Sequence, residues 1–388
     1  MAGTGGITWV CPGHLYDGRQ LRAGRALGVS GGKVVALADA ARLADDAVRI
    51  DIAGIVTPGF VDLQVNGGGG LMVNANPTPQ AMAGIAAAHH RLGTVAILPT
   101  VISDTPEILS RAVEAAIAAK GQKGIAGLHI EGPHISVPRR GTHAEHFIRP
   151  LDMATIGHVR RLREAGVPVM LTLAPEAATD AQIGELAALG AVVSVGHSDV
   201  SADRAEAAFV AGASAVTHLF NAMSPMENRA PGLTGAAINS EVFAGIICDG
   251  IHVDDRMVGL AFRARPVPNR MFLVSDAMPT VGGPDHFSLY GQDIARDGDR
   301  LVNSEGSLAG AHTTMAVGVA RLVGVVGVDR ETALRAAILV PSSLMGLGLD
   351  RIDGRAVDDL IVLDDKCVLR GPLSVCLGQG ANSSLHLH

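Results

Sequence analysis

The sequence predicts an α/β fold, a (β/α)₈ barrel with a small β-sandwich domain formed from both chain ends. Three observations support this prediction. Apolar, strand-like segments alternate with Ala-rich helical segments over most of the chain, which is typical of a parallel sheet covered by helices. There are eight such strands over roughly 220 residues, the size of a (β/α)₈ barrel. Short β-prone runs lie outside this region, at both ends of the chain.

Composition narrows the class of protein. The 388 residues are 48% hydrophobic, 18% charged and 3% aromatic, as expected for a packed α/β enzyme. The net charge of −7, without basic runs interleaved with aromatic residues, argues against nucleic-acid binding. The four cysteines are scattered and lack the spacing of a disulfide framework or a thiolate metal site. Neither a signal peptide nor a membrane-spanning apolar run is found, so we expect a cytoplasmic chain without a membrane partner.

The expected barrel strands follow one another in chain order. They span residues 60–65, 95–99, 125–130, 167–173, 191–195, 215–219, 244–248 and 271–275. Helices are expected between most of them, at 78–92, 105–119, 153–165, 179–189, 202–211 and 254–264, and after the last strand at 313–325 and 330–339. We assign residues 58–351 to this TIM barrel, a metal-dependent hydrolase domain, and keep a doubly wound open sheet as the alternative fold.

The two chain ends are expected to form one further domain. β-prone runs occur at residues 7–10 and 33–37, and again at 360–363 and 373–376. The simplest arrangement pairs them, so that residues 1–57 and 352–388 form a small β domain into which the barrel is inserted.

Metal-ligating side chains stand where several expected strands end. Glu131, His197 and His218 end the third, fifth and sixth strands, and Asp276 ends the eighth. Each one alone could be a core histidine or a helix N-cap. In a (β/α)₈ barrel, however, these strand ends meet at one mouth, where catalytic groups lie. Their convergence therefore favours a functional site.

This residue set indicates metal-dependent hydrolysis. Two imidazoles and one carboxylate form the ligand set of a catalytic divalent ion, with a position open to water. We expect one ion per subunit, Zn²⁺ first, with Fe²⁺ or another divalent ion as alternatives. Such an ion polarises a carbonyl group and lowers the pKa of bound water. A carboxylate outside the ligand set must take and return the proton, and Asp276 is the candidate.

Longer motifs resemble the N-acetylglucosamine-6-phosphate deacetylase family of the amidohydrolase superfamily. The resemblance rests on residues 58–67, 129–133, 141–143, 196–198, 217–223, 229–233, 249–254, 275–277 and 308–310. It implies hydrolysis of the 2-acetamido group of an amino-sugar 6-phosphate, giving the free amine and acetate. It also implies a homodimer with shared active sites.

The resemblance assigns roles to matching positions. Glu131, His197 and His218 would hold the metal, and Asp276 would act as general base and then general acid. His143 would contact the reacting end of the sugar. The remaining substrate-binding positions are Asn221, Ala222, Arg229, His252, Leu308, Gly310, Gln64 and Asn66. Asn221, Ala222, Arg229 and His252 would hold the phosphate, the last two reaching into the site of the neighbouring subunit.

The sequence departs from the superfamily pattern in informative places. Many members carry His-x-His after the first strand for a second metal, whereas this chain has Gln64-Val65-Asn66. Neutral amides are poor ligands for a transition metal, so one ion is expected. His312 and Met278 replace residues of other character and could reshape the sugar or acyl site. A deacetylase of the galacto epimer is one alternative function, and a non-catalytic sugar-phosphate binding protein is another.

Overall fold

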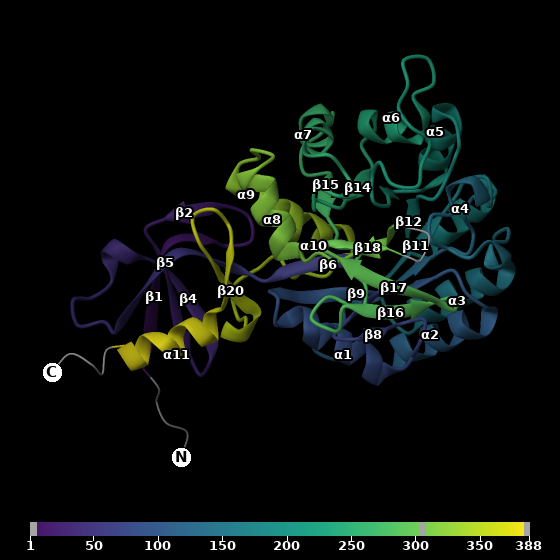
Figure 1. Cartoon of the computed structure of the whole chain (residues 1–388). Helices are drawn as coiled ribbons and strands as arrows, with labels where there is room; N and C mark the ends of the chain where they lie inside the picture. The colour runs from purple at the N-terminus through teal and green to yellow at the C-terminus, as the bar shows by residue number, and fades with distance from the viewer. Residues whose placement is uncertain (1–5, 303–307, 384–388) are drawn as a thin grey trace.

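Eight parallel strands form the central sheet of the computed structural model, which describes residues 6–302 and 308–383. Each strand pairs with the next in chain order, which confirms the predicted barrel architecture (Figure 1). The strands are β6 (Phe60–Val65), β9 (Thr94–Ile102), β10 (Leu128–Glu131), β11 (Val169–Leu173), β12 (Val192–Val195), β13 (Ala215–Val216), β14 (Phe243–Ile246) and β15 (Met271–Leu273). Nearly all their residues are buried, as expected for strands covered on both faces.

Helices follow the strands and cover the sheet. They are α1 (Pro79–His90), α2 (Pro106–Ala118), α3 (Met153–Glu164), α4 (Asp180–Ala188), α5 (Ala202–Ala211), α6 (Gly232–Asn239), α7 (Asp255–Ala264), α8 (Met315–Gly324), α9 (Arg330–Leu334) and α10 (Val340–Leu344). Thr78, Thr105 and Ser201 cap three of them by accepting a backbone N–H of the first turn. None of the described helices is long and apolar enough to cross a membrane.

The first and last barrel strands meet along a seam. An isolated bridge between Val65 and Ala277 joins them. The backbone N–H groups of Asn66 and Gly67 both donate to the Ala277 carbonyl, at 2.9 Å each. The Asp276 N–H donates to the Gln64 carbonyl at 3.0 Å. The barrel therefore closes at the level of Asp276.

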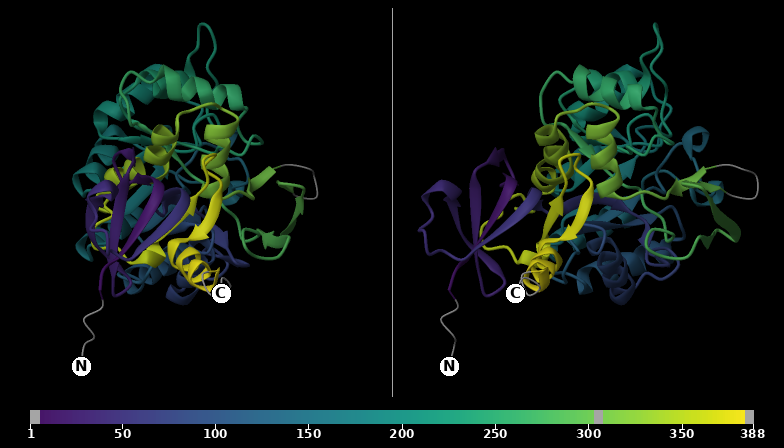
Figure 2. Two further views of the ribbon diagram at one scale, coloured as in Figure 1. Left: turned by 90° about the vertical axis from the view of Figure 1, so that its left-hand side faces the viewer. Right: turned by 60° about the vertical axis from the view of Figure 1, so that its left-hand side comes forward.

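The β domain contains strands from both ends of the chain, as predicted (Figure 2). They are β1 (Thr8–Tyr16), β2 (Leu21–Ala23), β3 (Arg25–Ser30), β4 (Lys33–Asp39), β5 (Arg49–Pro58), β20 (Leu360–Leu363) and β21 (Leu369–Pro372). Hydrogen bonds join all seven in one sheet, so the expected sandwich is not built from two separately bonded sheets. The domain limits at residues 57/58 and 351/352 stay a prediction.

The strand expected at residues 373–376 is wrong, because this segment begins helix α11 (Leu373–Ser383). Leu373, Cys376 and Leu377 pack against the apolar cluster of the β domain. Their i, i+3, i+4 spacing is the pattern of an amphipathic helix. The run of four apolar or small residues was too short to distinguish the two periods.

A four-stranded antiparallel sheet next to the barrel mouth was not predicted. It contains β16 (His286–Leu289), β17 (Gln292–Asp297), β18 (Arg300–Val302) and β19 (Leu308–Ala311). Leu289, Ile294 and Leu301 pack against a cluster that includes Ile102 and Met278 of the mouth. The sheet therefore covers one side of the site.

Candidate active site

The polar residues at the strand ends converge on one cavity of about 190 Å³. Its lining includes Glu131, His143, His197, His218 and Asp276. Three of these have left-handed backbones, with φ of 48° at His197, 28° at His218 and 52° at Asp276. Such conformations cost free energy for residues other than glycine and cluster at functional sites. The fold holds these residues in strained positions at its mouth.

Glu131, His197 and His218 form a tight triangle of ligand atoms. Glu131 Oε1 lies 3.3 Å from His197 Nε2 and 3.1 Å from His218 Nε2, and the two Nε2 atoms are 3.0 Å apart. Metal–ligand bonds of about 2.0–2.2 Å in a tetrahedron would place ligand atoms roughly 3.3–3.6 Å apart, slightly farther than in this triangle. A small outward movement of the three side chains would therefore accommodate one divalent ion.

The protonation of the triangle also fits an ion. His197 Nδ1 lies 2.9 Å from the Arg139 carbonyl and donates to it, so Nε2 has a free lone pair for a metal. Burial raises the pKa of Glu131, but hydrogen bonds and charge from His197 and His218 outweigh it and hold the pKa well below its usual value. Glu131 is thus an anionic ligand.

His143 lies next to this triangle. The ligand atoms of Glu131, His143 and His197 come within 4.8 Å of one another, a looser group than the triangle with His218. His143 Nδ1 accepts the Ser103 N–H at 3.4 Å and bonds Ser103 Oγ at 2.7 Å. Because a backbone N–H can only donate, Nε2 carries the proton of the neutral ring. Burial, with the neighbouring His197, lowers the pKa of His143 to about 3. His143 is therefore a neutral donor.

Asp276 is a half-buried carboxyl held by two amides. Asn66 Nδ2 donates to Oδ1 at 2.7 Å, and Gln64 Nε2 donates to the same oxygen at 3.1 Å. Burial, then the charge of Glu131, raises the pKa of Asp276 to about 6. Within the described residues Oδ2 receives no hydrogen bond, which leaves it available for proton transfer. A carboxyl with a raised pKa next to a metal-ligand set suits a general base.

Gln64 and Asn66 differ from the expectation that both contact substrate. Asn66 lines the cavity, but Gln64 does not and is 1% exposed. Gln64 Nε2 also donates to Glu131 Oε1 at 2.9 Å. One amide thus bridges the two carboxylates, at the sequence position where other superfamily members have a histidine.

Most of the residues expected to bind the phosphate and sugar share the same cavity. Asn221, Ala222, His252 and Gly310 all line it. His252 lines the cavity of its own chain, and the expectation that it reaches a neighbouring subunit's site stays a prediction. His252 Nδ1 lies 2.7 Å from Asp249 Oδ2, which fixes the ring.

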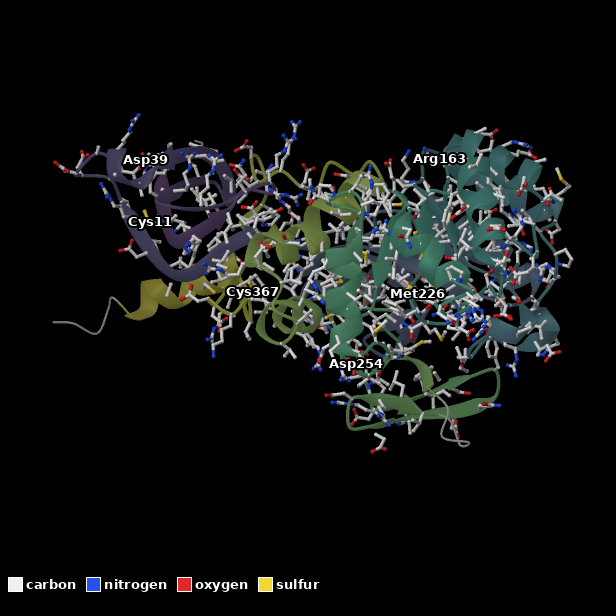
Figure 3. The ribbon with its side chains drawn as sticks, turned by 90° about the horizontal axis from the view of Figure 1, so that it is seen from above. Cys11, Asp39, Arg163, Met226, Asp254 and Cys367 are labelled. Atoms are coloured by element: carbon white, nitrogen blue, oxygen red, sulfur yellow. The ribbon has the colours of Figure 1, made fainter. Side chains whose placement is uncertain are left out.

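Arg229 lies outside this cavity. It belongs to the exposed loop 225–231, whose Met226 is labelled on the barrel half of the molecule in Figure 3. In the part of the chain that the structure describes, the Arg229 guanidinium has no ion pair or hydrogen bond. Leu308 pairs with Val302 at the start of β19, and its side chain lies outside the described residues.

Several cavity or supporting residues were not predicted. Ile102, Thr142 and Ile247 line the cavity. Below Glu131, His129 bonds Thr172 at 2.8 Å, and Thr172 bonds Thr217 at 2.7 Å. Thr172 and Thr217 lie in apolar strands or directly after them, and a single hydroxyl there gives no distinctive sequence signal.

A parallel barrel with a Glu, two His and an Asp at its mouth defines the class, a barrel hydrolase. No family model matches the chain. It is 38% identical to an N-acetylgalactosamine-6-phosphate deacetylase of Shewanella over 82% of this chain and 81% of that protein. It is 34% identical to the human N-acetylglucosamine-6-phosphate deacetylase over 90% of each chain. The crystal structure of N-acetylglucosamine-6-phosphate deacetylase from Pasteurella multocida aligns with a TM-score of 0.86 at 30% identity, covering 94% of this chain and 97% of that one. The chain therefore belongs to the N-acetylglucosamine-6-phosphate deacetylase family of the amidohydrolase superfamily and is a hydrolase.

Proposed function

We propose that the protein hydrolyses the 2-acetamido group of N-acetylglucosamine 6-phosphate to give glucosamine 6-phosphate and acetate. The convergence of Glu131, His197, His218 and Asp276 on one small cavity is the observation that carries this proposal. The family relationship supports the substrate class.

Glu131, His197 and His218 would hold one divalent ion, with Zn²⁺ the first candidate and Fe²⁺ an alternative. When bound, the ion would polarise the amide carbonyl and supply a water of lowered pKa. The Gln64 and Asn66 amides bond Asp276 where a second ion's ligands would be needed, which supports a single ion.

The protein's own groups would orient the amide and move the proton. Asp276 Oδ2 would accept the proton of the attacking water and then deliver it to the leaving nitrogen. The neutral His143 would donate from Nε2 to an oxygen at the reacting end of the sugar. His143 is buried and Asp276 is half-buried, which strengthens their interaction with charge that develops on the substrate.

The phosphate would be held by Asn221, Ala222 and His252 from one subunit. Arg229 is exposed and outside its own cavity, and this supports the proposal that it reaches the site of a second copy in a homodimer. A guanidinium can bond two phosphate oxygens at once, which suits this role. The four free cysteines are consistent with a cytoplasmic protein.

The galacto epimer remains the second candidate substrate, because the relative that is 38% identical acts on it. The test is the rate of amine release from N-acetylglucosamine 6-phosphate, its 4-epimer, and unphosphorylated N-acetylglucosamine. Fast release from the phosphorylated gluco sugar supports the proposal, and preference for the 4-epimer would replace it. Equal rates with and without the phosphate would remove the phosphate-binding assignments.

A further inference from the structure

Asp62 is a carboxyl on β6 that is 0% exposed and does not line the cavity. Three donors converge on it. The Ser275 hydroxyl donates to Oδ2, while the backbone N–H groups of Ser275 and Gln64 donate to Oδ1 at 3.2 Å each. A buried carboxyl is costly unless it is bonded in this way. The two contacts from Ser275 cross the barrel seam, from the first strand to the end of the last, whereas the Gln64 contact lies within β6.

Ser275 connects this carboxyl to both neighbours of Asp276. Its hydroxyl donates to Asp62 and also accepts the Ala277 N–H at 3.2 Å. Asp276 lies between Ser275 itself and Ala277, whose N–H this hydroxyl accepts. We call the Asp62–Ser275 pair the seam clasp.

Asp276 needs such support because its backbone is strained. Its φ of 52° lies in the left-handed region, which costs free energy for a residue other than glycine. The seam has no regular ladder to impose this conformation, and β15 ends at Leu273. The Asp276 backbone is also held by its N–H bond to Gln64, by the Ala311 N–H on its carbonyl at 3.2 Å, and by Asn66 Nδ2, which donates to the same carbonyl at 3.4 Å.

We infer that the seam clasp positions the general base: Asp62, acting through Ser275, holds Asp276 where its carboxyl meets the metal triangle. The inference rests on the proposed function, which makes Asp276 the base. Asp62 touches no cavity surface, so it is a positioning residue and not a catalytic one. A clasp that only closes the barrel would affect stability and leave turnover unchanged.

The experiment compares Ser275→Ala and Asp62→Asn with Ser342→Ala as the matched control. Ser342 is also a fully buried serine, with its hydroxyl accepting the Leu349 N–H at 2.8 Å, and it lies outside the cavity. The measurements are kcat and KM for N-acetylglucosamine 6-phosphate, zinc per chain and the melting temperature.

Ser275→Ala should lower kcat roughly 10²-fold, the effect of displacing a catalytic group by about 1 Å. KM should stay within about twofold of the wild-type value and the metal should remain bound, because the substitution removes no group that binds the substrate in its ground state. Asp62→Asn keeps an acceptor for the Ser275 N–H and should lower kcat less. Ser342→Ala should lower the melting temperature and keep kcat. Wild-type kcat in folded Ser275→Ala and Asp62→Asn variants would overturn the inference.

A crystal structure of Ser275→Ala separates this inference from the proposed function. Absence of amine release by the wild-type protein would defeat the proposed function alone. A displaced Asp276 carboxyl in the variant would still support the clasp, and an unmoved one would contradict it.

Discussion

Two of the cavities in the barrel differ in character. The mouth cavity is about 190 Å³, whereas a cavity beside the start of β15 is about 370 Å³ and is lined by Arg265, Arg270 and Arg335 among others. In the larger cavity, Arg265 and Arg270 make contacts that stabilise the fold. The Arg265 guanidinium donates to the Ala237 and Val242 carbonyls, and Arg270 lies over the Phe243 ring at 4.5 Å.

At the mouth, acidic and imidazole groups bond one another instead of the backbone alone. They also occupy left-handed conformations at His197, His218 and Asp276, while the larger cavity has one such non-glycine residue, Asn269. Asparagine and aspartate tolerate this conformation better than most residues, so the two histidines at the mouth mark the difference. Hydrogen bonds among titratable groups, and not the volume of a cavity, therefore identify the candidate active site.

The largest expected effect is at Asp276. Asp276→Asn keeps the shape of the side chain and removes its ability to take a proton. We expect kcat to fall roughly 10²–10⁴-fold, the contribution of a general base. Amine-release kinetics measure this loss, with metal content and melting temperature as controls. Near wild-type turnover would exclude Asp276 from the mechanism and weaken the contrast between the cavities.

A pair of arginine variants sharpens the comparison at an intermediate scale. Arg229→Ala should raise KM for the phosphorylated sugar about 10- to 100-fold, because a charge-assisted bond contributes about 1.5–3 kcal/mol. Arg270→Ala, in the larger cavity, should leave KM unchanged and reduce stability by about 1 kcal/mol as its contact with Phe243 is lost. Steady-state kinetics and urea unfolding provide both values. An unchanged KM in Arg229→Ala would mean that another cation holds the phosphate.

The smallest effect concerns pH and stability at Asp62. Burial raises the pKa of Asp62 to about 7, against the bonds from Ser275 and Gln64. The pKa of an aspartate in the unfolded chain is about 3.9. Between these two pKa values the folded chain binds more protons than the unfolded chain. The stabilisation that protonated Asp62 contributes is therefore complete below a pH of about 4 and is lost as the pH rises towards about 7.

Urea unfolding across this pH range measures the effect. The slope from one such group cannot exceed about 1.4 kcal/mol per pH unit. Asp62→Asn should reduce the slope of the unfolding free energy against pH. Arg270→Ala should leave this slope unchanged, because a guanidinium does not titrate in this pH range. A difference between wild type and Asp62→Asn that is constant with pH would show that the folded pKa is not raised.

The sequence was sufficient for the barrel because its signals are strong and local. Apolar strands with few charged residues, and helices that begin after Thr78, Thr105 or Ser201, indicate both the alternation of the elements and their boundaries. The antiparallel sheet next to the mouth was missed, although the Tyr290–Gly291 turn separates two of its strands with positive φ at both residues. The Asp297–Gly298 pair, where β17 ends before β18, is the stronger sequence signal of a hairpin there.

The site was only partly predictable, for reasons of range. The sequence predicts four of the site residues because each stands at the end of an apolar strand: Glu131, His197, His218 and Asp276. Gln64 was expected to bind substrate. Its role depends instead on hydrogen bonds to Glu131 and Asp276, which lie 67 and 212 positions further along the sequence. Asp62 also had no local signal, because its partner Ser275 is 213 positions away.

The most direct test of the account is a metal titration of chelator-treated protein, with acetate release from N-acetylglucosamine 6-phosphate followed at each step. The account predicts no activity in the metal-free chain, a linear rise to one equivalent of Zn²⁺ per chain, and no tight binding in His197→Ala or His218→Ala. Full activity without bound metal, or a requirement for a second equivalent, would contradict it.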